Sequence, residues 1–316
     1  MNSRRIGVTF LLQMLCFFLL VFGITVYYAS NPAGKDLGIV ENLIVSQSVN
    51  VLPLAFMLLI GRRKFRDEKV FRDILGFRRI KISTALMTVL YTFLLMPLTT
   101  LANAISMIFV DNTVANLSGD ILNVPFVVMF TIMAVFGPFC EEVVFRGAFF
   151  RGFRKTGNIF GAIVISGILF ALMHMNLNQA AYALLLGTMM ALLAEATGST
   201  WAPFIVHFIF NGQSVCLLFL EDKLVPELME EELESFGGSE LMFAIAVYLL
   251  LAVVCTSIAF CVVTWIASNE GKQNFLRTIW ASRKNRSGRL WSVCLAIGVA
   301  LALVYIGIET AAQILM

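Results

Sequence analysis

Ionisable and amide side chains recur at a spacing of four residues within otherwise apolar stretches of this chain. In EEVVFR, residues 141–146, Glu142 and Arg146 share one helix face, with the acid N-terminal to the base, the favourable order for an ion pair. Glu141 projects about 100° away from Glu142. Arg146 can therefore hold Glu142 ionised while Glu141 faces a cavity. The alternative is a structural cluster in which both carboxylates and Arg146 neutralise one another at an interface.

The two histidines of the chain lie in two further motifs with this spacing. In FALMH, which ends at His174, the ring of Phe170 can pack against the imidazole and orient it. In HFIFN, which begins at His207, the imidazole and the amide of Asn211 project the same way and can donate to one point. Each motif also has a structural explanation: His174 as a packing residue, and Asn211 in an interhelical hydrogen bond worth about 1 kcal/mol.

A carboxylate, two imidazoles and an amide that are buried together suit hydrolysis. The carboxylate can take a proton from water while one histidine holds that water. The other histidine and the asparagine can donate to the oxyanion that forms when water attacks a carbonyl. Such donors are worth about 3–4 kcal/mol each.

The same side chains could also bind a metal ion. Glu141, His174 and His207 could bind a catalytic zinc ion with water in its open position. The HExxH motif is absent, however, and asparagine is a poor zinc ligand. We therefore expect either no cofactor or a divalent metal, and we favour the metal-free mechanism. A covalent mechanism is disfavoured, because nothing in the sequence pairs Cys140 with a base.

The composition places these motifs in a membrane. The chain is 59% hydrophobic and 14% charged, with a mean hydropathy of +0.87, whereas soluble domains are about 45–50% apolar and about 25% charged. We expect an all-α, polytopic transmembrane helical bundle of about nine spans, with eight as the alternative. The nine candidates are residues 6–28, 41–61, 84–110, 122–145, 158–175, 178–196, 200–220, 241–267 and 291–313. The second is the weakest, because Ser46, Gln47, Ser48 and Asn50 interrupt it.

Lysine and arginine predict the orientation of the bundle, because cytoplasmic loops carry the excess of positive charge. With the N-terminus inside, the inner segments hold 21 of the 23 basic residues, and the exceptions are Lys35 and Lys223. These inner segments are residues 1–5, 62–83, 146–157, 197–199 and 268–290. The acidic loop at 221–240 then lies outside, and the segment 62–83 is either a solvated linker or an interfacial helix. We expect an integral protein of a bacterial plasma membrane, with the N-terminus cytoplasmic and the C-terminus outside.

A rise of 1.5 Å per residue brings the three motifs to similar depths. Counted from the inner face, Glu141 lies about 20 Å deep, His207 and Asn211 about 12–18 Å, and His174 about 24 Å. The depth of His174 is somewhat too large, which tilt or a sunken loop could absorb. Polar groups from three helices can thus meet near the middle of the bilayer. An ionisable group there costs several kcal/mol unless it is paired, and it therefore indicates a functional site.

In order along the chain, EEVVFR, FALMH and HFIFN match the patterns EExxxR, FxxxH and HxxxN/D. This set resembles the CPBP family of intramembrane proteases, which includes CAAX prenyl endoproteases and bacterial bacteriocin-processing or immunity (Abi-like) proteins. The resemblance covers about residues 120–220, which we expect to be the catalytic core of a single membrane domain, 1–316. Residues 1–119 and 221–316 would add flanking transmembrane helices and loops.

The resemblance implies an α-helical membrane core with a cavity, and hydrolysis of a peptide bond within or beside the membrane. Carried over by motif, Glu141 would be the general base. His174 would help to position the water, and His207 with Asn211 would form the oxyanion site. The implied supporting residues are Glu142, Arg146 and Phe170. The family has been described both as glutamate proteases and as metalloproteases, so the resemblance leaves the metal question open.

Three functions therefore compete. The first is an intramembrane endopeptidase acting on a membrane-associated or lipid-modified peptide, such as a prenylated protein or a bacteriocin or pheromone precursor. The second is a membrane transporter, in which intramembrane acids and histidines relay protons or bind a substrate. The third is a non-catalytic scaffold or immunity protein that keeps the motifs for structure. Membrane lipids are expected partners, and nucleic acids are not.

Overall fold

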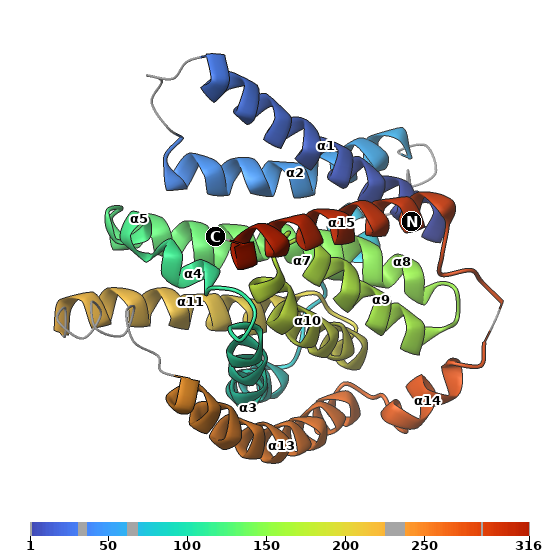
Figure 1. The fold of residues 1–316 in the computed structure, drawn as a ribbon. Helices are drawn as coiled ribbons and strands as arrows, with labels where there is room; N and C mark the ends of the chain where they lie inside the picture. The colour runs from blue at the N-terminus through green and yellow to red at the C-terminus, as the bar shows by residue number, and fades with distance from the viewer. Residues whose placement is uncertain (1, 31–36, 62–68, 225–237, 286, 316) are drawn as a thin grey trace.

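Helices make up the structure (Figure 1), a computed structural model that describes residues 2–30, 37–61, 69–224, 238–285 and 287–315. Within these residues there is no strand, and eight helices are long and apolar enough to cross a membrane, which confirms the expected all-α, polytopic bundle. The eight are α1 (Ser3–Ser30), α2 (Ile39–Ile60), α3 (Ile82–Ser106), the helix Phe126–Arg154, α10 (Leu177–Thr197), α11 (Trp201–Leu224), α13 (Gly238–Asn269) and α15 (Val293–Leu315). The shorter helices include η1 (Val70–Ile74), α4 (Thr113–Asn116), α5 (Ser118–Leu122), α9 (Ile159–Leu172) and α14 (Phe275–Ser282).

The fifth predicted span, 158–175, is shorter than expected. Helix α9 has 14 residues, or about 21 Å at 1.5 Å per residue, which is less than the roughly 30 Å of a hydrocarbon core. A turn follows in which Met175 has a left-handed φ of 56°, and Asn176 caps α10 by accepting from the Gln179 N–H at 2.8 Å. The α9–α10 hairpin returns the chain to the end of the bundle at which α9 begins (Figure 1). Whether or not α9 is counted as a membrane span, the helices after α10 therefore start from the same end of the bundle.

The helix that carries both glutamates is continuous from Phe126 to Arg154 but changes its hydrogen-bond register along the way. Two π-helical segments alternate with α-helical ones, in the order α6 (Phe126–Phe130), η2 (Thr131–Phe136), α7 (Gly137–Glu142), η3 (Val143–Phe150) and α8 (Arg151–Arg154). Such π segments are rare and are frequent at functional sites. The predicted span 122–145 lies several residues too early, because α5 is a separate helix and Pro125 is the N-cap of the long one.

Helix α10 lies at the centre of the bundle. Of its 18 most apolar consecutive residues, 61% are buried, the largest share among the eight long helices of the described residues. It packs against α9, α3 and α11, while α3 packs on α13 and α1 packs on α15. Gly187 permits a close approach of α10, because a Cβ there would lie 2.8 Å from Cδ1 of Phe170 and 3.3 Å from Nη2 of Arg146. Helix α10 therefore packs directly against Phe170 and Arg146, two of the supporting residues of the predicted site.

The predicted segment 62–83 contains, in its described part, one short helix, η1, followed by non-helical chain up to α3. Ile74 and Leu75 are buried, whereas Phe71 is exposed. This part of the segment therefore packs against the bundle and does not form a long interfacial helix. Lys35, residues 62–68, and residues 225–237 of the predicted acidic loop lie outside the described residues.

Candidate active site

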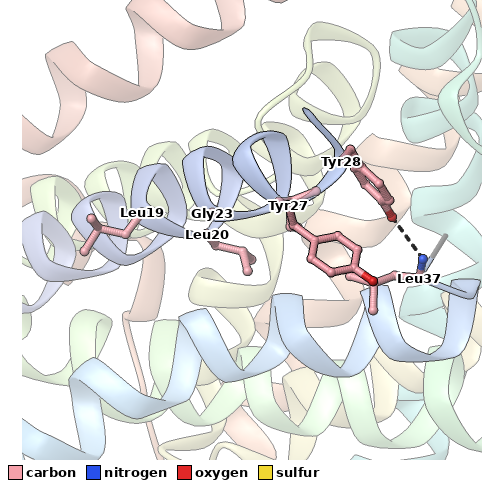
Figure 2. Close-up of a pocket in the computed structure, with 7 residues that line it drawn as sticks. Leu19, Leu20, Gly23, Tyr27, Tyr28 and Leu37 are labelled. Carbon is pink, nitrogen blue, oxygen red and sulfur yellow. Dashed lines mark hydrogen bonds between the residues drawn. The ribbon is translucent and has the colours of Figure 1, made fainter. Parts of the chain in front are cut away.

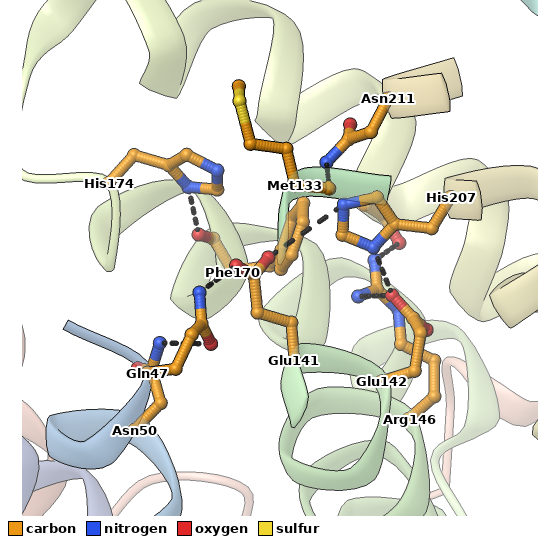
Figure 3. A network of polar contacts seen from close by, with 11 residues as sticks. Gln47, Asn50, Met133, Glu141, Glu142, Arg146, Phe170, His174, His207 and Asn211 are labelled. Carbon is orange, nitrogen blue, oxygen red and sulfur yellow. Dashed lines mark hydrogen bonds and ion pairs between the residues drawn. The ribbon is translucent and has the colours of Figure 1, made fainter. Parts of the chain in front are cut away.

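A buried ion pair anchors the site (Figure 3). Glu142 and Arg146 are fully buried, and Oε1 of the carboxylate lies 2.8 Å from Nη1 of the guanidinium, so the pair that the spacing predicts is present. The same Oε1 lies 2.9 Å from Nδ1 of His207, and Nη2 of Arg146 donates to the carbonyl of Gly187 at 3.2 Å. A carboxylate paired with arginine can only accept hydrogen bonds. Nδ1 of His207 therefore carries the hydrogen, and its Nε2 is the nitrogen left for other partners.

Glu141 points away from this ion pair and into a cavity. Its Oε2 lies 3.8 Å from Nε2 of His207, and its Oε1 accepts from Nε2 of Gln47 at 2.9 Å (Figure 3). The two neighbouring glutamates thus occupy different environments, with side-chain exposures of 17% for Glu141 and 0% for Glu142. A separation of 3.8 Å is too long for a direct hydrogen bond. In the neutral ring Nε2 is an acceptor, as is the carboxylate, so one water molecule could donate to both.

His174 lies in the turn after α9 and not on the helix face that its spacing predicts. Its Nδ1 lies 2.9 Å from the backbone carbonyl oxygen of Phe170. Because a carbonyl can only accept, Nδ1 is the donor and Nε2 of the neutral ring is an acceptor. In Figure 3, His174 and His207 lie on either side of Glu141. The helix ends before His174, so a uniform helical rise does not apply to the last residues of the predicted span.

Phe170 is the packing centre of the site. Its ring meets the imidazoles of His174 and His207 edge-on, with centroids 5.0 Å and 5.6 Å apart. Cζ of Arg146 lies 4.2 Å from the same ring centroid, a distance suited to a cation–π contact. The motif predicts only the contact with His174. In the structure, one aromatic ring positions both histidines and the arginine.

Asn211 lines the cavity, and its amide is engaged with the neighbouring π-helical segment. Nδ2 donates to the carbonyl of Met133 at 3.0 Å. In η2 the N–H of Gly137 bonds to the carbonyl of Ile132, five residues back. In that register the next carbonyl, that of Met133, would be paired with Pro138, which has no N–H. Asn211 thus satisfies a carbonyl that the local backbone cannot, and this leaves the second N–H of its amide for another acceptor.

Three amide side chains outside the motifs extend the network to α1 and α2. Nδ2 of Asn50 lies 3.5 Å from Oε1 of Gln47, and Nε2 of Gln13 donates to the backbone carbonyl of Asn50 at 2.8 Å. All three side chains are buried. The sequence carries a signal for two of them, because Gln47 and Asn50, three apart on one helix face, are two of the four polar residues that interrupt the second predicted span. Two of the polar residues that lower the hydropathy of this span are thus ones that α2 contributes to the site.

The cavity in front of Glu141 has a volume of about 560 Å³, within the range of small-molecule sites. Its walls come from α1, α2, α3, the helix Phe126–Arg154, α9, α10, α11 and the turns beside them. The lining includes all four predicted catalytic residues, Glu141, His174, His207 and Asn211. Side chains from three motifs therefore line one cavity.

Among the described side chains, no group of three or more His, Cys, Asp and Glu residues is arranged to hold a metal ion. Glu141, His174 and His207 line one cavity, but they do not form the three-ligand set that a catalytic zinc ion requires.

The region that forms the site has relatives among known proteins. Residues 123–213 match the family described as "Type II CAAX prenyl endopeptidase Rce1-like", and this stretch contains all three motifs. This part of the chain is therefore similar to the CPBP family that its motifs resemble. The family match and the eight long apolar helices among the described residues make the chain an integral membrane protein.

A curated relative is similar to part of the chain. The Bacillus subtilis (strain 168) protein named "Putative membrane peptidase YdiL" is 29% identical over 83 residues, which is 26% of this chain and 34% of the relative. The chain thus aligns with about a third of the relative's length. No solved structure matches the chain. Helix α2, which supplies Gln47, lies outside the CPBP match.

Proposed function

We propose that this chain is an intramembrane endopeptidase that hydrolyses a peptide bond of a membrane-associated or lipid-modified substrate. One observation carries the proposal: Oε2 of Glu141 and Nε2 of His207 lie 3.8 Å apart in a cavity, and Glu142 holds the imidazole from the other side at 2.9 Å. The CPBP match of the core and the relative named as a membrane peptidase support the proposal. Prenylated proteins and bacteriocin or pheromone precursors are the substrate classes under consideration.

In the proposed reaction a water molecule lies between Glu141 and His207 and donates a hydrogen bond to each. Glu141 removes a proton from this water, and the water oxygen attacks the carbonyl carbon of the substrate. Glu141 then passes the proton to the leaving nitrogen, and the C–N bond breaks. The products are a carboxylate and an amine, because the second proton of the water is taken up by Nε2 of His207 and released to solvent. The carboxylate of Glu141 is thereby regenerated.

The oxyanion of the intermediate needs hydrogen-bond donors. Asn211 would supply the N–H that Met133 does not use. Nε2 of His207 accepts from the water at the start, and it would donate to the oxyanion once it has taken up the second proton of that water. His174, with Nε2 as an acceptor, would help to hold the water or a substrate N–H. These roles divide the four cavity residues between water activation and charge stabilisation.

Replacing Gln47 by leucine is expected to lower kcat about 10- to 100-fold, because a hydrogen bond to a charged group contributes about 1.5–3 kcal/mol. The Gln47 amide donates to Oε1 of Glu141 and so fixes the direction in which Oε2 points. Kinetics of the purified variant measure the effect. Ser48→Ala is the matched control on the same helix, because Ser48 bonds to the Ile44 carbonyl and should leave kcat unchanged.

Chelation of metal ions is expected to leave at least half of the activity of the purified protein, because the proposed steps use Glu141, His207 and water. Activity is measured before and after dialysis against EDTA and 1,10-phenanthroline, with metal content determined on the same samples. Loss of activity on chelation, with recovery on addition of Zn²⁺, would replace the metal-free mechanism by the zinc mechanism.

The function is tested by comparing the termini of membrane peptides in cells that carry the wild-type chain and in cells that carry Glu141→Gln. The endopeptidase is expected to generate new N- and C-termini that are absent with the variant. A transporter would instead show substrate flux that depends on Glu141, without new termini. A scaffold would show neither difference.

For the topology we propose the orientation that the basic residues predict: an N-terminus in the cytoplasm and a C-terminus outside, in a bacterial plasma membrane. The described basic segments lie at a common end of the bundle, where Arg154 and Lys272 both contact Glu195. Their shared position supports this orientation.

A further inference from the structure

The segments rich in lysine and arginine meet at one end of the bundle. The N–H of Thr200 donates to the carbonyl of Gly76 at 2.9 Å, and Arg154 forms an ion pair with Glu195. Lys272 reaches the same place and donates to the backbone carbonyl of Glu195. We call this end, formed by residues 69–81, 151–158, 195–200 and 268–285, the basic end. It lies to the right in Figure 1, where α8, α9 and α14 are labelled.

The cavity occupies the opposite half of the bundle. Its lining on α2 begins near the helix start, at Leu43, and on α3 it includes Asn103, in the last turn of that helix. It continues to Asn112, beyond the end of α3, and to Ser214 on α11, which is exposed. Of the residues that line the cavity, none belongs to the basic end. Access to Glu141 is therefore from the end of the bundle that is farthest from the basic segments.

The outer part of the cavity has two chemically different sides. Three amide side chains, Asn103, Asn112 and Gln179, are among its lining residues. Their oxygens accept from Asn178, Val114 and Asn176, and the amides keep further hydrogen-bonding capacity. Leu20 of α1 lines both this cavity and a second, mostly apolar groove of about 360 Å³. Figure 2 shows this groove, with Tyr27 and Leu20 turned toward it. A polar surface and an apolar surface thus meet beside one opening.

We infer that the site is reached from the extracytoplasmic face of the membrane, because basic segments stay on the cytoplasmic face. The ligand class follows from the two sides of the opening, and its identity as a substrate rests on the function proposed above. The ligand is a peptide segment next to an apolar membrane anchor. The amide side chains hold the backbone of the peptide, and the apolar anchor lies along α1. The scissile bond of such a substrate is exposed on the extracytoplasmic face. A lipidated tail that remains in the cytoplasm would meet the basic end, away from the cavity.

Cysteine labelling tests the direction of access without using catalysis. Single cysteines are introduced as Asn112→Cys and Ser214→Cys at the opening, and as Lys284→Cys at the basic end, in a chain whose six native cysteines are replaced by alanine. If that chain folds poorly, the native chain serves as the background and as the blank. A membrane-impermeant maleimide is added to intact cells and, in parallel, to inside-out vesicles.

In intact cells the maleimide is expected to label the cysteines at positions 112 and 214 and not the one at position 284, with the reverse pattern in inside-out vesicles. Labelling of positions 112 and 214 only from the cytoplasmic side, together with position 284, would overturn the inference. Absence of label at 112 and 214 from both sides would also overturn it, because the opening would then be closed to water.

The termini measured in cells supply the second readout. Glu141-dependent cleavage sites should map to the extracytoplasmic ends of membrane segments, and sites at cytoplasmic ends would contradict the proposed substrate class. If the cysteines are labelled as expected but no termini depend on Glu141, the endopeptidase function is contradicted. The inferred direction of access would still hold in that case. The two proposals can therefore fail separately.

Discussion

Replacing Glu141 by glutamine should lower kcat by about 10²- to 10⁴-fold, the usual contribution of a general base, without loss of folded protein. The substitution keeps the size of the side chain, and the carbonyl of the new amide can still accept from Gln47, as Oε1 of the carboxylate does. What it removes is the basic oxygen that faces His207 across 3.8 Å. Kinetics on protein of verified monodispersity and thermal stability measure the effect.

The adjacent position provides the matched control. Glu142→Gln removes a charge of the same kind one residue away. Glu142 does not line the cavity; it is the partner of Arg146 and contacts Nδ1 of His207, and the oxygen of the new amide can still accept from that nitrogen. We expect the main effect of Glu142→Gln to be a lower stability of the fold. The molecules of this variant that remain folded should have a higher activity than Glu141→Gln. If Glu141→Gln stays active while Glu142→Gln is folded and inactive, the assignment of the two glutamates is reversed.

Replacing Arg146 by methionine should destabilise the protein by about 3–5 kcal/mol, the usual cost of leaving one partner of a buried ion pair uncompensated. The guanidinium is fully buried, contacts Glu142 at 2.8 Å and the Gly187 carbonyl at 3.2 Å, and lies on the ring of Phe170. Methionine fills a similar volume, so the loss is electrostatic and not a cavity effect. Thermal or chemical unfolding in nanodiscs measures it.

Two further variants make this prediction specific. Arg154→Met removes another Arg–Glu pair, but the arginine side chain is 48% exposed, so the expected loss is about 1 kcal/mol or less. The double variant Glu142→Gln with Arg146→Met should recover most of the lost stability, because no unpaired charge remains and Oε2 of Glu142 and Nε of Arg146 lack hydrogen-bond partners in the described structure. Wild-type stability of the single variant Arg146→Met would contradict the account.

The spacing of residues within one helix predicted the local relations in the site well. Four-residue spacing places Glu142 beside Arg146, and the 100° offset turns Glu141 toward the cavity, as the structure has them. Hydropathy alone likewise predicted the all-α bundle and most helices within a few residues of their ends. These features depend on helix geometry and composition, which the sequence carries directly.

The relations between distant helices were not predictable in this way. Gln47 and Glu141 are 94 positions apart, and only the packing of α2 against α7 brings them together. The link from Asn211 to Met133 depends on a π-helical register, which periodicity does not reveal. His174 was expected on a helix, but α9 stops at Leu172. Each of these details depends on tertiary packing or on a local break in helix geometry.

The central claim is that Glu141 activates water to cleave a peptide bond. Its most direct test uses purified protein in nanodiscs with the peptide identified from the cellular termini, in water enriched in ¹⁸O. The account predicts that the new C-terminal carboxylate carries ¹⁸O with the wild-type chain, and that with Glu141→Gln its rate of formation falls by at least about 10²-fold. Equal rates of ¹⁸O-labelled product with both proteins, or no labelled product with the wild type, would contradict it.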